Sequence, residues 1–247
     1  MGTVIRLTDV IIQNDALPFA QIPYSGITDG LILACQLRRN LALSSDISGN
    51  NTSVTLNGAP TFKPTHMSCV NIVGLNTGVD TTGNTSRTMC VVAQIIPGMT
   101  GNAFLINNYD GGRGCSLFVT AADGLRCQVI LSNGGVIVAP MPQNIPGLDV
   151  NVNDWFFASF VIDVESAKAT LYIPSKNFKY SINLAYPLFE SNLKTLMIGR
   201  SSSTATFTGE SNIAYATYHD RALTESEIMI QHASAKSYCE AVGIALP

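Results

Sequence analysis

The chain has 247 residues, of which 46% are hydrophobic and only 13% are charged, and its formal net charge is -3. This length and apolar content allow one large domain with a sizeable core. The weakly acidic balance argues against nucleic-acid binding, which needs several phosphate contacts from Lys or Arg. No apolar run approaches the ~18 residues of a membrane-spanning helix, so we expect no membrane span.

Residues 1–27 form a distinct opening segment. Its short apolar runs are broken by turn-forming pairs such as Leu17–Pro18, so we expect an arm or attachment peptide before a domain over residues 28–247. The segment lacks the charged and apolar regions of a secretory signal peptide. The sequence therefore predicts synthesis in the cytoplasm, with any export through assembly or lysis.

A turn-rich loop at residues 44–51 follows the first apolar stretch of the domain. Asp, Ser, Asn and Gly favour turns because their side chains bond the local backbone or tolerate positive φ. Calcium prefers carboxylate and carbonyl oxygens, which makes Asp46 with Asn50 a weak candidate calcium site. Asp110, in a later loop, is a second weak candidate.

Strand signals recur at short intervals up to residue 218 and are separated by Gly-rich turns. Asp-Gly and Asn-Gly pairs between apolar runs are typical of hairpins. Many short strands joined in this way indicate an all-β antiparallel sandwich or barrel. The expected strands span residues 69–73, 88–96, 103–106, 115–120, 125–131, 136–138, 155–162, 169–173, 180–182, 196–199 and 213–218.

Only residues 224–239 read clearly as a helix. Thr224 and Glu227 have the spacing of a capping box, in which each side chain satisfies a backbone donor at the helix start. Apolar positions then recur at helical spacing. These positions are Ile228, His232, Ala235 and Cys239.

The six cysteines and three histidines carry no metal or redox spacing. Most cysteines have apolar neighbours, so we expect reduced thiols that act as small core residues. The histidines lack the partners of a nucleophilic triad, and we expect structural roles for them.

The closing segment, residues 195–230, places a short strand ending in Ile-Gly, a Phe-Thr-Gly turn, a second strand, an Asp-Arg turn and the capped helix in this order. This order resembles the end of concanavalin A-like, laminin G-like jelly rolls. The Asp46–Asn50 loop and the Trp155–Tyr172 hairpin resemble the same family at independent positions. The resemblance implies an all-β, concanavalin A-like antiparallel β-sandwich with one short C-terminal helix.

The same resemblance implies a ligand site on the loops, in many members for glycans. Polar groups orient sugar hydroxyls and aromatic rings stack on sugar C–H faces. Two loops offer this mixture, although an ordinary polar turn is the alternative for the first of them. The candidate ligand-binding residues are Asn107, Asn108, Tyr109, Asp110 and Arg113 in one loop, and Arg200 in the other.

Some β-glucanases of this superfamily carry Glu-x-Asp-x-Glu on one strand, and retaining hydrolysis needs two such carboxyls. Asp163 and Glu165 match that pattern here, but Val161 occupies the position of the nucleophile. We therefore expect no enzymatic activity and interpret Asp163 as a residue of a turn. A glycan-active hydrolase is the alternative.

The start of the chain, GTVIRLTDVIIQNDALPFAQ, resembles the start of some bacteriophage and prophage structural proteins. This resemblance implies a virion protein of the tail or a decoration protein on the particle surface, which contacts other virion proteins through its arm. The apolar surface of arm and helix predicts a homo-oligomer. A structural assembly module without a ligand is a further alternative.

Overall fold

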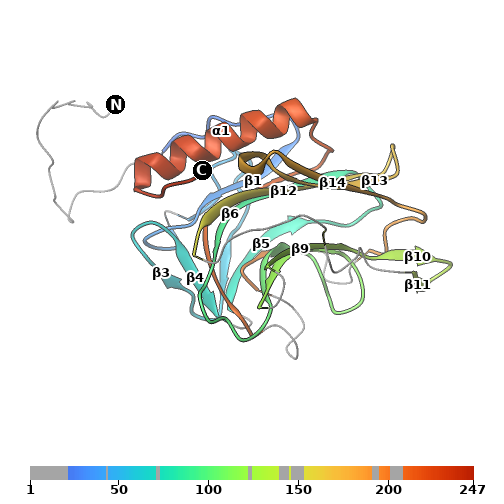
Figure 1. Ribbon diagram of the computed structural model, residues 1–247, viewed down its shortest axis with the longest axis horizontal. Helices are drawn as coiled ribbons and strands as arrows, with labels where there is room; N and C mark the ends of the chain where they lie inside the picture. Colours follow the sequence, from blue (N-terminus) through green and yellow to red (C-terminus); the bar gives the residue numbers. More distant parts are fainter. Residues whose placement is uncertain are drawn as a thin grey trace, which may run out of the picture.

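The computed structural model describes most of the chain after residue 21. The described residues are 22–42, 44–70, 73–121, 124–138, 145, 153–190, 195–200 and 208–247. They form two antiparallel sheets packed face to face, with one C-terminal helix on the outside of the larger sheet (Figure 1). The predicted β-sandwich with a single C-terminal helix is confirmed.

The larger sheet has eight strands. In spatial order they are β14 (Phe178–Asn183), β13 (Lys168–Ile173), β12 (Trp155–Asp163), β6 (Arg87–Ile95), β16 (Glu210–His219), β4 (Met67–Val70) and β3 (Thr61–Phe62), and β1 (Leu31–Gln36) also pairs with β16. A short 3-10 helix, η1 (Pro174–Lys176), connects β13 to β14.

The smaller sheet has six strands. Their order is β2 (Thr55–Asn57), β5 (Gly74–Asp80), β15 (Thr195–Ile198), β7 (Ala103–Asn107), β8 (Cys115–Thr120) and β9 (Gly124–Val129). A separate hairpin is formed by β10 (Leu131–Asn133) and β11 (Val136–Val138). Its two-residue Gly134–Gly135 turn has positive φ at both positions, which glycine adopts without strain.

Both faces of the central strands are buried. In β6, Met89 and Val91 belong to the core between the sheets, whereas Cys90 and Val92 belong to a second core beneath helix α1 (Glu225–Val242). Successive side chains of a strand point to opposite faces. A strand covered on both sides therefore reads as a continuous apolar run, which explains why the sequence signals for β6 and β12 are strong.

The predicted strand 125–131 is wrong as a single element, because it divides into β9 and β10 at Ile130, whose backbone N–H bonds Gly114 O. The sequence analysis also missed β5, GLNTGVD, which contains several residues that favour turns. Thr77 accounts for part of this strand's placement, since its hydroxyl donates to the carbonyl of Leu196 in β15.

Helix α1 begins where the capping box predicts. Thr224 is the N-cap, its hydroxyl accepts from the N–H of Glu227, and the Glu227 carboxylate accepts from the N–H of Thr224. The predicted end at residue 239 is too early, because the helix continues to Val242. Gly243 then takes a left-handed conformation and its N–H caps the last turn, which is the usual way that glycine ends a helix.

All six cysteines are free and buried, as expected for core residues. Burial raises the pKa of every thiol, to about 11 for Cys90 and to about 12 for Cys239. The thiols therefore stay protonated at neutral pH, where thiolate chemistry needs a lowered pKa. They fill space in the two cores.

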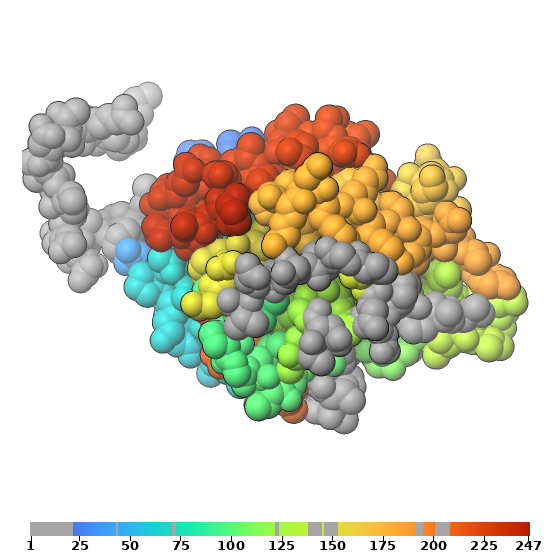
Figure 2. Space-filling model, in the orientation of Figure 1, coloured from blue at the N-terminus to red at the C-terminus, as the bar shows by residue number. Residues whose placement is uncertain are grey.

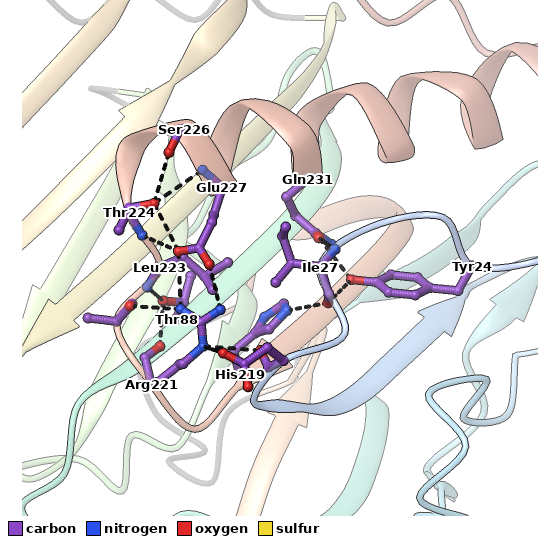
Figure 3. Close-up of polar contacts among 12 residues, drawn as sticks. Tyr24, Ile27, Thr88, His219, Arg221, Leu223, Thr224, Ser226, Glu227 and Gln231 are labelled. Atoms are coloured by element: carbon purple, nitrogen blue, oxygen red, sulfur yellow. Dashed lines mark hydrogen bonds and ion pairs between the residues drawn. The ribbon is translucent and has the colours of Figure 1, made fainter.

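Residues 22–29, which we call the strap, lie against α1 and include the described end of the predicted arm. Residues 1–21 of that arm lie outside the described residues. The buried amide of Gln231 joins three elements (Figure 3): its Oε1 accepts from Tyr24 Oη at 2.8 Å and from Ile27 N at 3.2 Å. Its Nε2 donates to Tyr215 Oη and Thr217 Oγ1 of β16, both at 3.1 Å.

We predict that Gln231→Ala lowers the free energy of unfolding by about 2 kcal/mol or more, because it leaves buried donors and acceptors without partners. Denaturant unfolding followed by circular dichroism measures this change. Glu240→Ala, at an exposed position of the same helix, is the control and should change stability by less than about 0.5 kcal/mol. Equal effects of the two substitutions would contradict the role of this amide.

Candidate ligand-binding site

The loop that follows β7 does not present its two asparagines to a ligand, which corrects the expectation for Asn107 and Asn108. Their exposed fractions are 0% and 2%. The Asn107 amide donates to the carbonyl of Arg200 at 2.6 Å, and its oxygen accepts from the N–H of Tyr109. Asn108 bridges Thr81 Oγ1 and the N–H of Cys115. Both side chains stabilise the loop instead.

The other predicted residues of this loop, Tyr109, Asp110 and Arg113, are half-buried. Asp110 accepts hydrogen bonds from the N–H groups of Gly112 and Arg113, which makes it a turn-forming side chain. The Arg113 guanidinium lies 4.3 Å from the centroid of the Phe189 ring, as in a cation–π contact. The Tyr109 ring packs on Phe104, with 5.8 Å between centroids. Burial and the neighbouring Asp110 raise the pKa of Tyr109.

The two loops predicted to carry a site are adjacent, because Asn107 reaches the backbone of Arg200. Arg200 itself is half-buried, and residues 201–207 of its loop lie outside the described residues. Tyr109, Asp110, Arg113 and Arg200 remain candidate contacts of a ligand.

The residues predicted to bind calcium are engaged with the protein. Both oxygens of Asp46 accept from protein donors at 2.8–3.0 Å, including the backbone N–H groups of Ala34 and Thr52. Asn50 turns its amide nitrogen toward the carbonyls of Leu31 and Ile32. Within the described residues no three His, Cys, Asp or Glu side chains gather as a metal site.

Asp163 ends β12 and organises the turn into β13, as the sequence indicated. Its carboxylate accepts from the N–H groups of Glu165 and Ser166 and from Ser166 Oγ. The hydroxyl of Ser166 is the main reason that the pKa of Asp163 is lowered. The carboxylate therefore has a structural task in this turn.

A group of ionisable side chains lies at the start of α1 (Figure 3). Arg221 makes a bidentate contact with Glu227, at 2.6 and 3.1 Å, and a 2.9 Å ion pair with Asp29 of the strap. Buried His219 contacts the carbonyl of Ile27 through Nε2 at 3.0 Å, which makes Nε2 the donor. The group links strap, strand and helix, and most of its polar atoms make structural contacts, whereas buried Nδ1 of His219 has no hydrogen-bond partner among the described residues.

A pocket that the sequence analysis did not find lies at one end of the sandwich. It encloses about 300 Å³. Three segments far apart in the chain form its walls: a loop before β6, the turn after β12 and the stretch after β14. Figure 2 shows the last two as neighbouring yellow and orange surfaces. The lining residues are Asn84, Val164, Ala167, Leu184, Ala185, Tyr186, Pro187 and Leu188.

Hydrogen bonds fasten the three walls to one another. Leu188 N donates to Asn84 Oδ1 at 3.0 Å, and Val164 N donates to Ser86 Oγ at 2.9 Å. The third link runs from Leu184 N to the carbonyl of Ala167 at 2.8 Å. The pocket is therefore formed before any ligand arrives, which lowers the entropy cost of binding.

Two polar groups of the pocket are unused by the protein. Asn84 bonds Leu188 through its oxygen only, and its amide nitrogen has no partner among the described residues. Tyr186 is 37% exposed, and its hydroxyl has no hydrogen bond within the same part of the chain. An aromatic ring, an amide donor and apolar walls thus meet in one concave site.

The β10–β11 hairpin stands beside this pocket. Ser132 N donates to the carbonyl of Pro187, and Leu131 forms a bridge with Leu188. On the far side of the turn, Val136 and Ile137 are 67% and 52% exposed. An apolar projection therefore flanks the pocket, and larger ligands would meet it.

The sequence matches no protein-family model and no curated protein. The fold, however, is similar to solved structures of binding domains. The binding domain of botulinum neurotoxin serotype D superposes with a TM-score of 0.61 at 16% identity, over 85% of this chain and 52% of that chain. This likeness agrees with the concanavalin A-like antiparallel β-sandwich that the sequence predicted.

Two further structures share this fold. The binding domain of Paraclostridial Mosquitocidal Protein 1 gives a TM-score of 0.58 at 16% identity, over 83% of this chain and 52% of that one. A Trypanosoma rangeli sialidase mutant displaying trans-sialidase activity gives a TM-score of 0.60 at 12% identity, over 87% of this chain and 34% of that chain. This chain thus spans about half the length of the toxin domains.

We predict that stability falls in acid in two steps. Burial lowers the pKa of His219 below 6.5, so the unfolded chain binds this proton more readily and stability drops as pH falls below about 6.5. The bond from Arg221 lowers the pKa of Glu227 from 4.5 to about 2, so its contribution disappears as pH falls from 4.5 toward 2. Urea unfolding midpoints measured between pH 8 and pH 3 test this.

Two variants separate the steps. His219→Gln should flatten part of the decline below pH 6.5. The rest should remain, because half-buried His66 and His232 also have lowered pKa values. Glu227→Gln should remove the loss below pH 4.5 and leave the first step unchanged. An unchanged pH profile in both variants would show that other groups control acid unfolding.

Proposed function

We propose that this chain is a non-enzymatic binding module that recognises carbohydrate on a receptor or cell surface. The observation that carries this proposal is the preformed pocket of about 300 Å³, with the exposed ring of Tyr186 and the unused amide of Asn84. Ligand pockets are typically apolar concavities of this size or larger that hold a few placed polar groups. Lectin sites combine these features.

The fold comparison supports a binding role by analogy. The toxin domains with the same fold are described as binding or receptor-binding domains. A fold hosts many functions, and the site must decide among them. In this chain the pocket and the adjacent loop at Tyr109–Arg113 supply the site.

Hydrolysis is the alternative, and the pocket disfavours it. Retaining and inverting glycosidases both need a pair of carboxyl groups that flank the scissile bond. None of the residues lining the pocket is acidic, although Glu165 belongs to the turn that forms one wall. With Val161 at the position of the nucleophile, we propose that the chain binds sugar without cleaving it.

Attachment to a phage particle remains a proposal from residues 1–27. The strap supports it, because Tyr24 and Ile27 fix the base of that segment to α1. In this proposal the arm contacts other virion proteins, copies of the chain form a homo-oligomer, and the domain lies on the particle surface. Immunogold labelling of particles would test this location separately from sugar binding.

We predict that the full chain binds a subset of an immobilised glycan array. The same protein should release no reducing sugar from the polysaccharides that it binds, because the pocket lacks the paired carboxyls. Protein unfolded by heat is the control for nonspecific adhesion. Absence of binding across the array would overturn the carbohydrate role, and release of reducing sugar would favour the hydrolase.

A further inference from the structure

We infer that the pocket beside Tyr186 accepts an uncharged pyranose ring and discriminates against anionic sugars. This inference rests on the proposed carbohydrate binding and adds the class of sugar. It follows from the charges around the pocket, from the groups left free inside it and from the way its walls are held.

Among the described residues that line the pocket, none has a charged side chain. Six of the eight lining residues are aliphatic or proline, and the other two are Asn84 and Tyr186. A carboxylate that enters such a site loses its water and gains no ion pair, which is a large desolvation cost. A neutral hydroxylated ring has no such cost if its hydroxyls find partners.

The arginine that holds the Asn84 loop already has hydrogen-bond partners within the protein. Arg87 is buried, and its guanidinium donates to the carbonyls of Thr81, Gly83 and Thr85. These three bonds hold the loop that carries Asn84, so Arg87 positions the loop, and the described lining residues of the pocket include no Lys or Arg. Arg113, in the next loop, stacks on Phe189.

Acidic groups near the pocket also disfavour an anionic sugar. The turn that supplies Val164 and Ala167 to the pocket also contains Asp163 and Glu165. Hydrogen bonds from Ser166 and Glu165 favour the ionised form of Asp163. Lys168, next to Ala167, offsets one of these two carboxylates, so the turn keeps a net negative charge close to the lining residues Val164 and Ala167, and a sialic or uronic acid would be repelled.

The free groups of the pocket suit a pyranose. The Tyr186 ring offers a face for sugar C–H groups, and Asn84 Nδ2 is a donor for a ring or hydroxyl oxygen. Because Asn84 Oδ1 is fixed by Leu188 N, the direction of the amide nitrogen is set by the fold. Tyr186 Oη can donate to or accept from a second hydroxyl.

Saturation-transfer difference NMR with single sugars tests the inference. The probes are the methyl glycosides of glucose, galactose, mannose and N-acetylglucosamine, with N-acetylneuraminic acid and glucuronic acid as anionic comparators. We expect at least one neutral glycoside to bind and both acids to bind at least tenfold more weakly. Tyr186→Ala should weaken the affinity for the neutral sugar roughly threefold to tenfold, because it removes an aromatic contact.

Three variants isolate the groups. Asn84→Asp keeps an acceptor for Leu188 N but removes the donor, so it should weaken neutral sugar binding at an unchanged unfolding midpoint. Tyr186→Phe keeps the ring and should have a smaller effect than Tyr186→Ala. Tyr172→Ala, which removes a half-buried ring of β13 that does not line the pocket, is the matched aromatic control and should leave affinity within about twofold.

The outcomes separate this inference from the proposed function. Binding of the acids at equal strength, with the same loss in Tyr186→Ala, would overturn the charge selectivity and leave carbohydrate binding intact. Sugar binding that is lost in Tyr109→Ala and unchanged in Tyr186→Ala would overturn the pocket as the site. If no sugar of either class binds and the glycan array is also negative, the proposed function fails with the inference.

Discussion

Strand β16 is the element on which most of this structure depends. One edge of it pairs with β6 along nearly its whole length, and the other edge pairs first with β4 and then with β1. Its outer face presents Tyr215 and Thr217 to Gln231 of α1. A single strand therefore orders the sheet, holds the helix and, through that helix, fixes the strap. The sequence motif over residues 195–230 was easy to recognise because it contains this central strand and the start of the helix that packs on it.

The fold could be predicted because its central strands are covered on both faces and the helix carries a capping box. Both features leave marks within short windows of sequence. Strand β5 was missed because its placement depends on partners, such as Leu196, more than a hundred residues away. The pocket was missed for a similar reason, since Asn84 and Tyr186 approach each other only after the sheets form. No local pattern marks such a site.

The loop at residues 107–113 shows why composition misled the search for a site. Asn and Asp in a loop suit sugar recognition, but they also satisfy the loop's own backbone. Asn107 and Asn108 satisfy the backbone, because a loop that connects two buried strands must provide its own hydrogen bonds. The amide nitrogen of Asn84 and the hydroxyl of Tyr186, which have no partner among the described residues, belong instead to a pocket with few polar groups. A donor without a protein partner therefore indicates a binding site better than a loop with many polar residues does.

The strap and the C-terminal residues decide how the molecule can be presented. In Figure 1 the described start of the strap and the C-terminus both lie at the left, whereas the β10–β11 hairpin lies at the far right. The pocket is next to that hairpin. A partner held at the described start of the strap or at the C-terminus would thus hold the domain by the end opposite its pocket. Such a holder, whether a particle or a neighbouring domain, would leave the pocket facing outward and accessible to a surface that approaches it.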